Sequence, residues 1–225
     1  MMLTNAVAVA DVAIPTLCAT GHPLDLPGRL ALPESARGLV LFAHGSGSSR
    51  FSPRNQHVAD VLHESWIGTL LFDLLTEQEA GDRVNVFDIG LLGERLAAAI
   101  AFVRSQDRTA ALPLGLFGAS TGAAAALVAA AHDPGVAAVV SRGGRPDMAG
   151  AALSRVYCPT LLIVGGHDEE VVSLNRTALE HLGGEKQLSV IPGATHLFEE
   201  PGTLDEAARL AAEWFARHLH PKGRS

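Results

Sequence analysis

The sequence is poor in cysteine and in long apolar runs. Its 225 residues include two cysteines, Cys18 and Cys158, which lie far apart and lack the Cys-x-x-Cys spacing of a metal or redox site. The longest unbroken apolar run, residues 123–131, is too short to cross a bilayer. No basic segment precedes the first apolar residues, which argues against a signal peptide. These absences predict a soluble, cytoplasmic protein.

The chain also lacks any dense run of charge of one sign. It has 17 basic and 24 acidic residues and a net charge of −7, without a basic stripe. This distribution indicates neither a nucleic-acid surface nor an anionic membrane surface. A hydrophobic content of 48% is that of a folded domain. We therefore expect a small-molecule substrate as the partner, and the sequence leaves open whether the protein is a monomer or a homodimer.

What the sequence does contain is a regular alternation of apolar runs and helical patterns. Turn signals divide residues 7–32, which predicts an antiparallel N-terminal hairpin. From residue 38 onward the alternation is typical of a parallel sheet covered by helices on both faces. The expected strands are 38–43, 69–72, 112–117, 137–140, 160–164 and 187–191, followed by a last helix over 204–218. We expect a single α/β domain over residues 1–225, with a tail at 221–225.

The most specific motif is Gly118-Ala119-Ser120-Thr121-Gly122, which follows an apolar run and precedes an alanine-rich helical pattern over 121–132. Strand, turn and helix in this order are the setting of a nucleophile elbow, where glycines leave room for a sharp turn. Such a turn exposes the serine beside a helix N-terminus, whose free N–H groups favour an oxyanion. The alternative is a plain structural Gly-Ser turn. The context favours Ser120 as a nucleophile.

A serine hydroxyl needs a base, and the base needs a group that orients it. Asp168 and His196 each lie one loop beyond a predicted strand, at the carboxyl edge where catalytic groups of open α/β sheets gather. Asp168 could instead cap the helix that follows, and His196 could be one surface histidine among ten. Weaker candidates for the acid and the base are Glu169, Glu170 and His167. The order Ser, Asp, His is that of an α/β-hydrolase and favours the triad Ser120, Asp168 and His196.

The oxyanion also needs two N–H donors. One is expected to be the backbone amide of Thr121, directly after the nucleophile. The other is expected from the loop 44–49, His-Gly-Ser-Gly-Ser-Ser, where we choose the amide of Ser46, with Gly47 next. A phosphate-binding glycine loop is the alternative, but this loop lacks the lysine of a P-loop and the spacing of a dinucleotide fingerprint.

On these residues the chain resembles the α/β-hydrolase superfamily, and within it the dienelactone hydrolase-like family. The resemblance covers about residues 30–219 and rests on His44-Gly45-Ser46, the Ser120 elbow, Asp168 and His196. It implies an α/β-hydrolase fold with a mainly parallel eight-stranded sheet, and hydrolysis of an ester, lactone or thioester without metal or cofactor. Dienelactone hydrolases proper use a cysteine nucleophile and a His-Glu sequence in the oxyanion loop. A serine esterase is therefore the inference for this chain.

The two segments in which a cap domain is usually inserted into this fold are short. Residues 73–88 hold a polar stretch without an amphipathic helical pair, and little chain follows the strand 137–140, so we expect a minimal cap or none and a shallow, open site. An open site suits small or extended acyl groups. Candidate substrate-binding residues are His44, Gly47, Arg50, Arg142 and Arg145. The arginines could attract a carboxylate or phosphate, although surface ion pairs are equally expected of loop arginines.

The sequence thus predicts a serine hydrolase that cleaves small carboxylic esters through an acyl-enzyme intermediate. A thioesterase or a lactone hydrolase would use the same residues, because the fold does not decide among them. In another class, the chain could be a non-catalytic binding module with a hydrolase fold.

Overall fold

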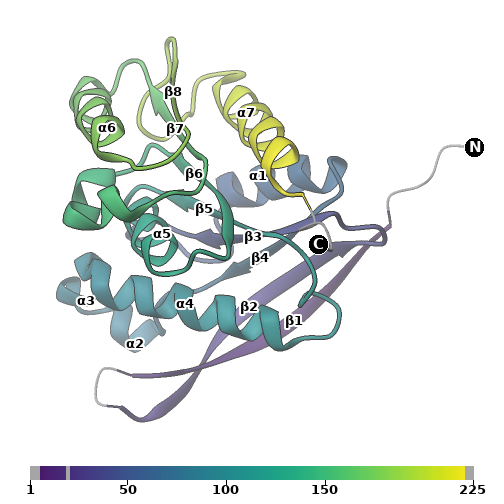
Figure 1. Cartoon of the computed structure of the whole chain (residues 1–225). Coiled ribbons are helices and arrows are strands. Elements are labelled where there is room, and N and C mark those ends of the chain that lie inside the picture. The colour runs from purple at the N-terminus through teal and green to yellow at the C-terminus, as the bar shows by residue number, and fades with distance from the viewer. Residues whose placement is uncertain (1–5, 19–20, 221–225) are drawn as a thin grey trace, which may run out of the picture.

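The computed structural model describes residues 6–18 and 21–220, so the tail expected at 221–225 lies outside the described residues. Its strands are β1 (Val7–Leu17), β2 (Pro23–Pro33), β3 (Gly38–Ala43), β4 (Ile67–Phe72), β5 (Leu114–Ala119), β6 (Val136–Arg142), β7 (Thr160–Gly165) and β8 (Lys186–Ile191). They form one eight-stranded sheet in the order β1-β2-β4-β3-β5-β6-β7-β8 (Figure 1). The first two pairs are antiparallel and the other neighbours are parallel. The mainly parallel α/β sheet with its N-terminal hairpin is confirmed.

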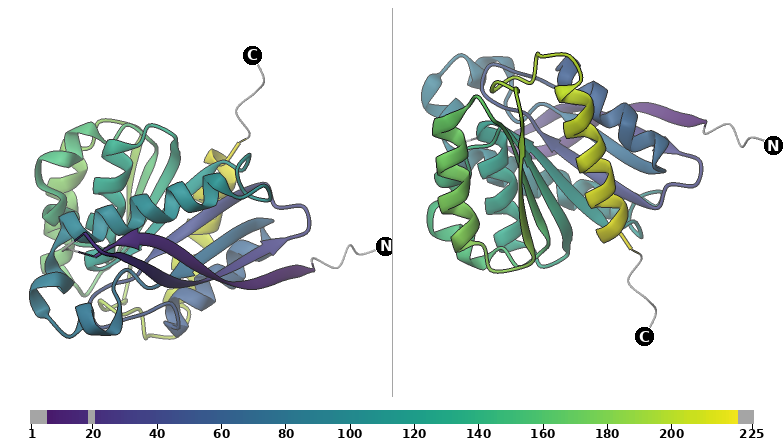
Figure 2. Two further views of the ribbon diagram at one scale, coloured as in Figure 1. Left: turned by 90° about the horizontal axis from the view of Figure 1, so that it is seen from below. Right: turned by 90° about the horizontal axis from the view of Figure 1, so that it is seen from above.

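Helices cover both faces of this sheet (Figure 2). They are α1 (Pro53–Glu64), α2 (Glu77–Ala80), α3 (Arg83–Phe87), α4 (Ile89–Ser105), α5 (Thr121–His132), the 3₁₀ segment η1 (Pro146–Arg155), α6 (Glu169–His181) and α7 (Thr203–His218). One apolar cluster joins the sheet to α4, α5, η1 and α6, and a second joins its other face to α1 and α7. None of the helices in the described ranges has the length and apolar character that crossing a bilayer requires.

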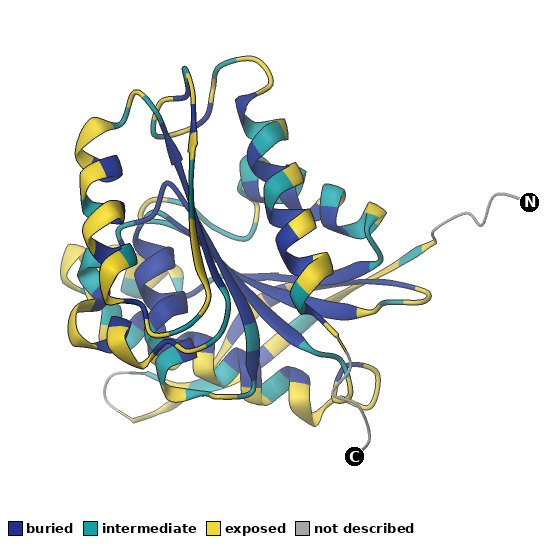
Figure 3. Ribbon diagram, turned by 45° about the horizontal axis from the view of Figure 1, so that its top comes forward, coloured by how far each residue is buried: buried dark blue, intermediate teal, exposed yellow. Residues whose placement is uncertain are grey.

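The central strands are apolar because both of their faces are covered (Figure 3). Alternate side chains point to opposite faces. Leu41 and Leu116 join the cluster under α4 and α5, whereas Phe42 and Phe117 stack with ring centroids 4.8 Å apart in the cluster under α1 and α7. The edge strand β1 is exposed along most of its length. The packed strands β3 and β5 therefore form a rigid base for the loops that leave their carboxyl ends.

Most differences from the sequence-based prediction lie at strand ends. The strand 38–43 and the helix 121–132 are confirmed, but β5 begins at Leu114 rather than at Leu112. The amide of Leu112 donates to Thr109 O in a turn, and Pro113 has no N–H to offer to a ladder. β6 extends as far as Arg142, since Arg142 is paired in the sheet with both neighbouring strands.

The segment after β4, predicted as a short polar stretch without an amphipathic helical pair, forms the two short helices α2 and α3. Thr76 and Glu79 form a capping box that begins α2, and Asp82 accepts a hydrogen bond from Val84 N at the start of α3. Glu79 also forms an ion pair of 2.6 Å with Arg95 of α4, a side chain only 1% exposed. Each helix is too short to show a 3.6-residue period in the sequence. The cap over the site is minimal, as expected, and the Glu79–Arg95 ion pair fixes it to α4.

Candidate active site

Ser120 occupies the turn between β5 and α5. Its φ of 51° and ψ of −123° are strained for a residue with a Cβ atom. The turn is tight because a Cβ on Gly122 would collide with the carbonyl oxygens of Ala43 and His44 at the end of β3. The strand, turn and helix expected around Ser120 are therefore present, and they place the half-buried serine at the carboxyl edge of the sheet.

Asp168 and His196 are joined by a hydrogen bond in which His196 Nδ1 donates to Asp168 Oδ2 at 2.6 Å. Asp168 is the residue before α6, yet its carboxylate makes no capping hydrogen bond, so the alternative interpretation as a helix cap is not supported. Because a carboxylate accepts, the imidazole proton lies on Nδ1 and Nε2 is left as an acceptor. The side chains are 39% and 17% exposed, which leaves the histidine open to solvent.

Ser120 and His196 both lie against the end of β6 and the residue that follows it. The amide of Ser120 donates to Arg142 O at 3.3 Å, and a Cβ on Gly143 would lie 3.7 Å from His196 Cε1. Within the described residues no hydrogen bond joins the Ser120 hydroxyl to His196. Hydrogen bonds of this kind are often long before substrate binds. The structure thus brings Ser120, Asp168 and His196 to one edge of the sheet, with the serine–histidine bond not yet formed.

The loop after β3 packs directly on the elbow. A Cβ on Gly45 would lie 2.8 Å from the Cβ of Ser120, and the amide of Ser46 donates to Thr121 Oγ1 at 3.0 Å. The amide of Thr121 has no hydrogen-bond partner in the described part of the chain. The two predicted oxyanion donors therefore lie in adjoining segments, but only the Thr121 amide is unoccupied.

His44 holds this loop in place. Its Nε2 accepts from Leu74 N at 3.1 Å and its Nδ1 donates to Gly45 O at 3.0 Å. Burial lowers the pKa of His44, so the ring stays neutral and keeps both bonds at neutral pH. His44 lines the cavity beside the loop, but neither ring nitrogen is available to a substrate.

Two of the candidate substrate-binding arginines are neutralised by carboxylates. Arg50 binds Asp73 through its backbone amide, at 2.6 Å, and through its guanidinium. Arg145 forms two hydrogen bonds with Asp147, at 2.9 Å and 2.7 Å, and is 39% exposed. Contact of either arginine with a substrate therefore competes with an existing ion pair.

Arg142 is the last residue of β6 and not, as predicted, a loop residue. It is only 7% exposed, with its guanidinium 5.6 Å from the ring of Phe198 and 3.4 Å from Asn55 Oδ1. Its Nε and Nη1 atoms are buried without a partner. Burial, together with the charge of Arg54, lowers the pKa of Arg142 to about 10. Arg142 thus carries a buried positive charge that forms no ion pair with a carboxylate of the described residues.

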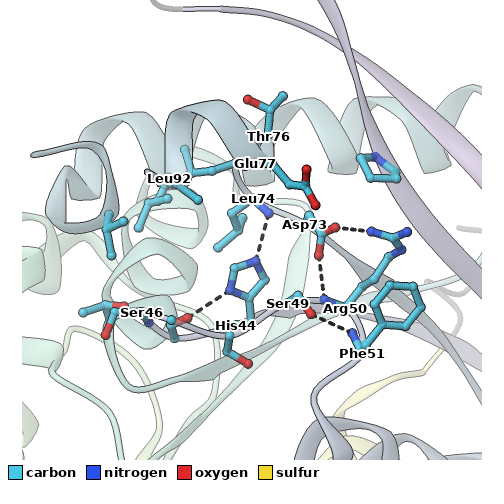
Figure 4. Close-up of a pocket in the computed structure, with 18 residues that line it drawn as sticks. His44, Ser46, Ser49, Arg50, Phe51, Asp73, Leu74, Thr76, Glu77 and Leu92 are labelled. Carbon is cyan, nitrogen blue, oxygen red and sulfur yellow. Dashed lines mark hydrogen bonds and ion pairs between the residues drawn. The ribbon is translucent and has the colours of Figure 1, made fainter. Parts of the chain in front are cut away.

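A cavity of about 650 Å³ opens beside the loop 44–49 (Figure 4). Its walls come from the loop after β3, the chain after β4, and the helices α2, α3 and α4. The prediction of a shallow site did not include this cavity. Its apolar lining includes Leu74, Leu75, Val86 and Leu92. Among the described residues no group of three or more His, Cys, Asp and Glu side chains is placed to hold a metal ion.

Comparison with known proteins identifies the class. Residues 36–217 match the model of a family described as “Alpha/beta hydrolase domain”, and the chain belongs to this hydrolase family. The crystal structure of a dienelactone hydrolase from Anabaena variabilis is 51% identical, with a TM-score of 0.89 over 95% of this chain and 99% of that one. The chain is accordingly a dienelactone hydrolase-like member of the family, as its motifs predicted.

Two further comparisons concern a solved structure that shares the fold and a curated protein that is similar in sequence. Est1E from Butyrivibrio proteoclasticus, solved with ferulic acid bound, is 16% identical with a TM-score of 0.76 over 92% of this chain and 98% of that one, which shows the shared fold alone. A protein of Mycobacterium tuberculosis named “Putative phosphoribosyl transferase” is 58% identical over 205 residues. That alignment covers 90% of this chain but 46% of the relative, so the chain spans about half the length of the curated relatives it matches.

Proposed function

We propose that this protein is a serine hydrolase that cleaves small carboxylic esters through an acyl-enzyme. Ser120 is the nucleophile, His196 the general base and Asp168 the residue that orients the histidine. The observation that carries the proposal is the 2.6 Å hydrogen bond from His196 Nδ1 to Asp168 Oδ2, which leaves Nε2 as a proton acceptor. A serine held at a strained turn on the same sheet edge supplies the group to be activated.

In the proposed reaction Ser120 Oγ attacks the ester carbonyl while His196 Nε2 takes its proton. His196 then gives this proton to the departing alkoxide, which leaves as an alcohol. A water molecule attacks the acyl-enzyme, His196 takes one of its protons, and the carboxylic acid leaves as Ser120 regains a proton. Asp168 stabilises the imidazolium in both halves of the cycle.

The amide of Thr121 is the first proposed oxyanion donor, since it has no other partner among the described residues. The amide of Ser46 is the second: its bond to Thr121 Oγ1 orients the loop before substrate binds, and the substrate oxygen then accepts from the same amide. The neighbouring amide of Gly47 is the alternative second donor. A Thr121 hydroxyl that accepts from Ser46 keeps the loop beside the elbow, so we assign this bond a positioning role.

Thioesters and lactones remain alternative substrates, because the same residues would cleave them. The name of the M. tuberculosis relatives suggests phosphoribosyl transfer, but the chain covers 46% of those proteins. In the cavity, Arg50 is already paired with Asp73, an arrangement that does not favour a phosphate group. We therefore favour hydrolysis for this chain.

The proposal is tested by intact-protein mass spectrometry after exposure to a fluorophosphonate. Wild type and the control Ser173→Ala, which alters an exposed serine of α6, should each gain a single adduct, and Ser120→Ala should gain none. Turnover of matched oxo-, thio- and cyclic esters would then rank the substrate classes. An adduct that persists in Ser120→Ala would remove Ser120 as the nucleophile, and no adduct on any protein would favour the binding-module alternative.

A further inference from the structure

The order of the strands separates two sides of the nucleophile. Ser120 follows β5, which has β3 and β4 on one side and β6, β7 and β8 on the other. Asp168 and His196 follow β7 and β8, whereas the 650 Å³ cavity is walled by the chain after β3 and β4 (Figures 1 and 4). Thr121 is the lining residue of that cavity that belongs to the elbow. The cavity and the catalytic base therefore lie on opposite sides of Ser120.

Resting on the function proposed above, we infer that this cavity holds the acyl group of the substrate and selects neutral, apolar acyl chains. In ester cleavage the leaving oxygen must meet His196, which protonates it. The leaving alcohol consequently extends toward the side of β7 and β8. The acyl group, on the other side of the carbonyl carbon, extends toward Gly45 and Thr121, which line the cavity.

The lining of the cavity suits an apolar chain near the carbonyl. In Figure 4, Leu92 and Ser46 lie at one end of the cavity and Leu74 lies near its middle. Arg50 and Phe51 lie at the other end. A chain that extends from the oxyanion loop would thus meet leucine side chains first. Burial of each methylene against such a wall favours binding.

The wall opposite the loop is held in place before any substrate binds. Glu79 of α2 pairs with the buried Arg95 at 2.6 Å, and Asn85 Nδ2 of α3 donates to Glu79 O at 3.0 Å. These bonds tie both short helices to α4. A preformed wall costs little ordering entropy when a chain is bound.

The charges in the cavity disfavour an anionic acyl group. Its described ionised lining residues are Arg50, Asp73 and Glu77, and Arg50 is already bound by Asp73. His44 is neutral and engaged on both ring nitrogens. The lining therefore has one more negative charge than positive charge, and a carboxylate at the end of an acyl chain would be repelled.

A series of p-nitrophenyl esters tests the assignment by chain length. From acetate to hexanoate, wild-type kcat/KM should rise about fourfold per methylene, which corresponds to about 0.8 kcal/mol. Val86→Trp fills the cavity from α3 and should abolish this rise in kcat/KM with acyl length. Val84→Trp is the matched control, because Val84 belongs to the same helix, is 73% exposed and does not line the cavity.

The charge preference is tested with p-nitrophenyl pentanoate and the p-nitrophenyl monoester of succinic acid, which have similar acyl lengths. Wild type should prefer the neutral ester by about tenfold or more. Asp73→Asn leaves Arg50 without its counter-charge and should narrow that preference. Equal turnover of the two esters by wild type would overturn the charge inference.

The outcomes separate this inference from the proposed function. If wild type turns over esters and Val86→Trp keeps the wild-type dependence on acyl length, the acyl assignment is wrong and the hydrolase proposal stands. If Val86→Trp instead alters selectivity among acetate esters of different alcohols, the cavity holds the leaving group. If no protein reacts with any ester or with the fluorophosphonate, the proposed function itself fails.

Discussion

Replacing the carboxylate of Asp168 by an amide tests the proposed proton relay directly. The Asp168→Asn side chain has nearly the same shape, but its amide nitrogen can donate to His196 Nδ1. The imidazole proton would then lie on Nε2, and Ser120 would lose its acceptor. The imidazolium formed during turnover would also lose the negative charge that now lies 2.6 Å from Nδ1.

We expect kcat to fall about 10³- to 10⁴-fold, which corresponds to a rise of about 4–5.5 kcal/mol in the activation barrier. Folding should change little, because the Asp168 carboxylate does not cap α6 and asparagine is itself a good residue before a helix. We expect the free energy of unfolding to stay within about 1 kcal/mol of wild type. The structure therefore predicts a catalytic loss without a matching loss of stability.

The assay is steady-state turnover of the best ester, together with the second-order rate of fluorophosphonate labelling and a urea unfolding curve. Glu169→Gln is the matched control, since it makes the same change of charge at the next residue, which is exposed. It should retain wild-type rates. An Asp168→Asn protein that is folded and keeps kcat within tenfold of wild type would refute the reasoning that His196 depends on this carboxylate.

Three further predictions concern the loop, the buried cation and pH. Thr121→Val removes the acceptor of the Ser46 amide and should lower kcat about tenfold with little change in KM, whereas Thr121→Ser keeps the acceptor and should restore it. Arg142→Met removes an uncompensated buried charge, so the free energy of unfolding, measured in urea at pH 7.5, should rise by about 1 kcal/mol; a clear fall would contradict this. Burial holds the pKa of His44 below its unfolded value of 6.5, so below that pH the unfolded chain binds a proton that the folded chain does not, and stability falls. Urea unfolding at pH 7.5 and 5.5 should show a smaller fall for His44→Gln than for wild type, and equal falls would exclude this role.

The features that the sequence predicted correctly are those set by local chemistry. A serine between glycines at the junction of an apolar run and an alanine-rich helix fixes the elbow, because few other residues fit that turn. The placement of Asp168 and His196 on the same edge follows from parallel strands, whose carboxyl ends meet there. The hydrogen bond between Asp168 and His196 could not be predicted from the sequence alone, because an aspartate that precedes a helix is equally expected to cap that helix.

The features that were missed depend on contacts between distant segments. The cavity combines Leu74 with Val86 and Leu92, which show no joint pattern in the sequence. Arg50 was a candidate either for substrate binding or for an ion pair, and the sequence did not indicate its partner Asp73, 23 residues away. The one-turn helices around them rest on caps and on a buried ion pair rather than on periodicity.

The position of β5 between the two halves of the site also bears on how such proteins diversify. The cavity takes its lining from residues up to Leu92 and from Thr121, whereas the acid–base pair lies after residue 160. A genetic crossover within α4 after Leu92, or a run of substitutions before it, would exchange the whole lining of the cavity except Thr121 and leave the bonded His196–Asp168 pair unchanged. The proposed acyl cavity and the proposed proton relay are encoded in separate stretches of the gene and can change under separate selection, so on this proposal one fold can combine many acyl preferences with one proton relay.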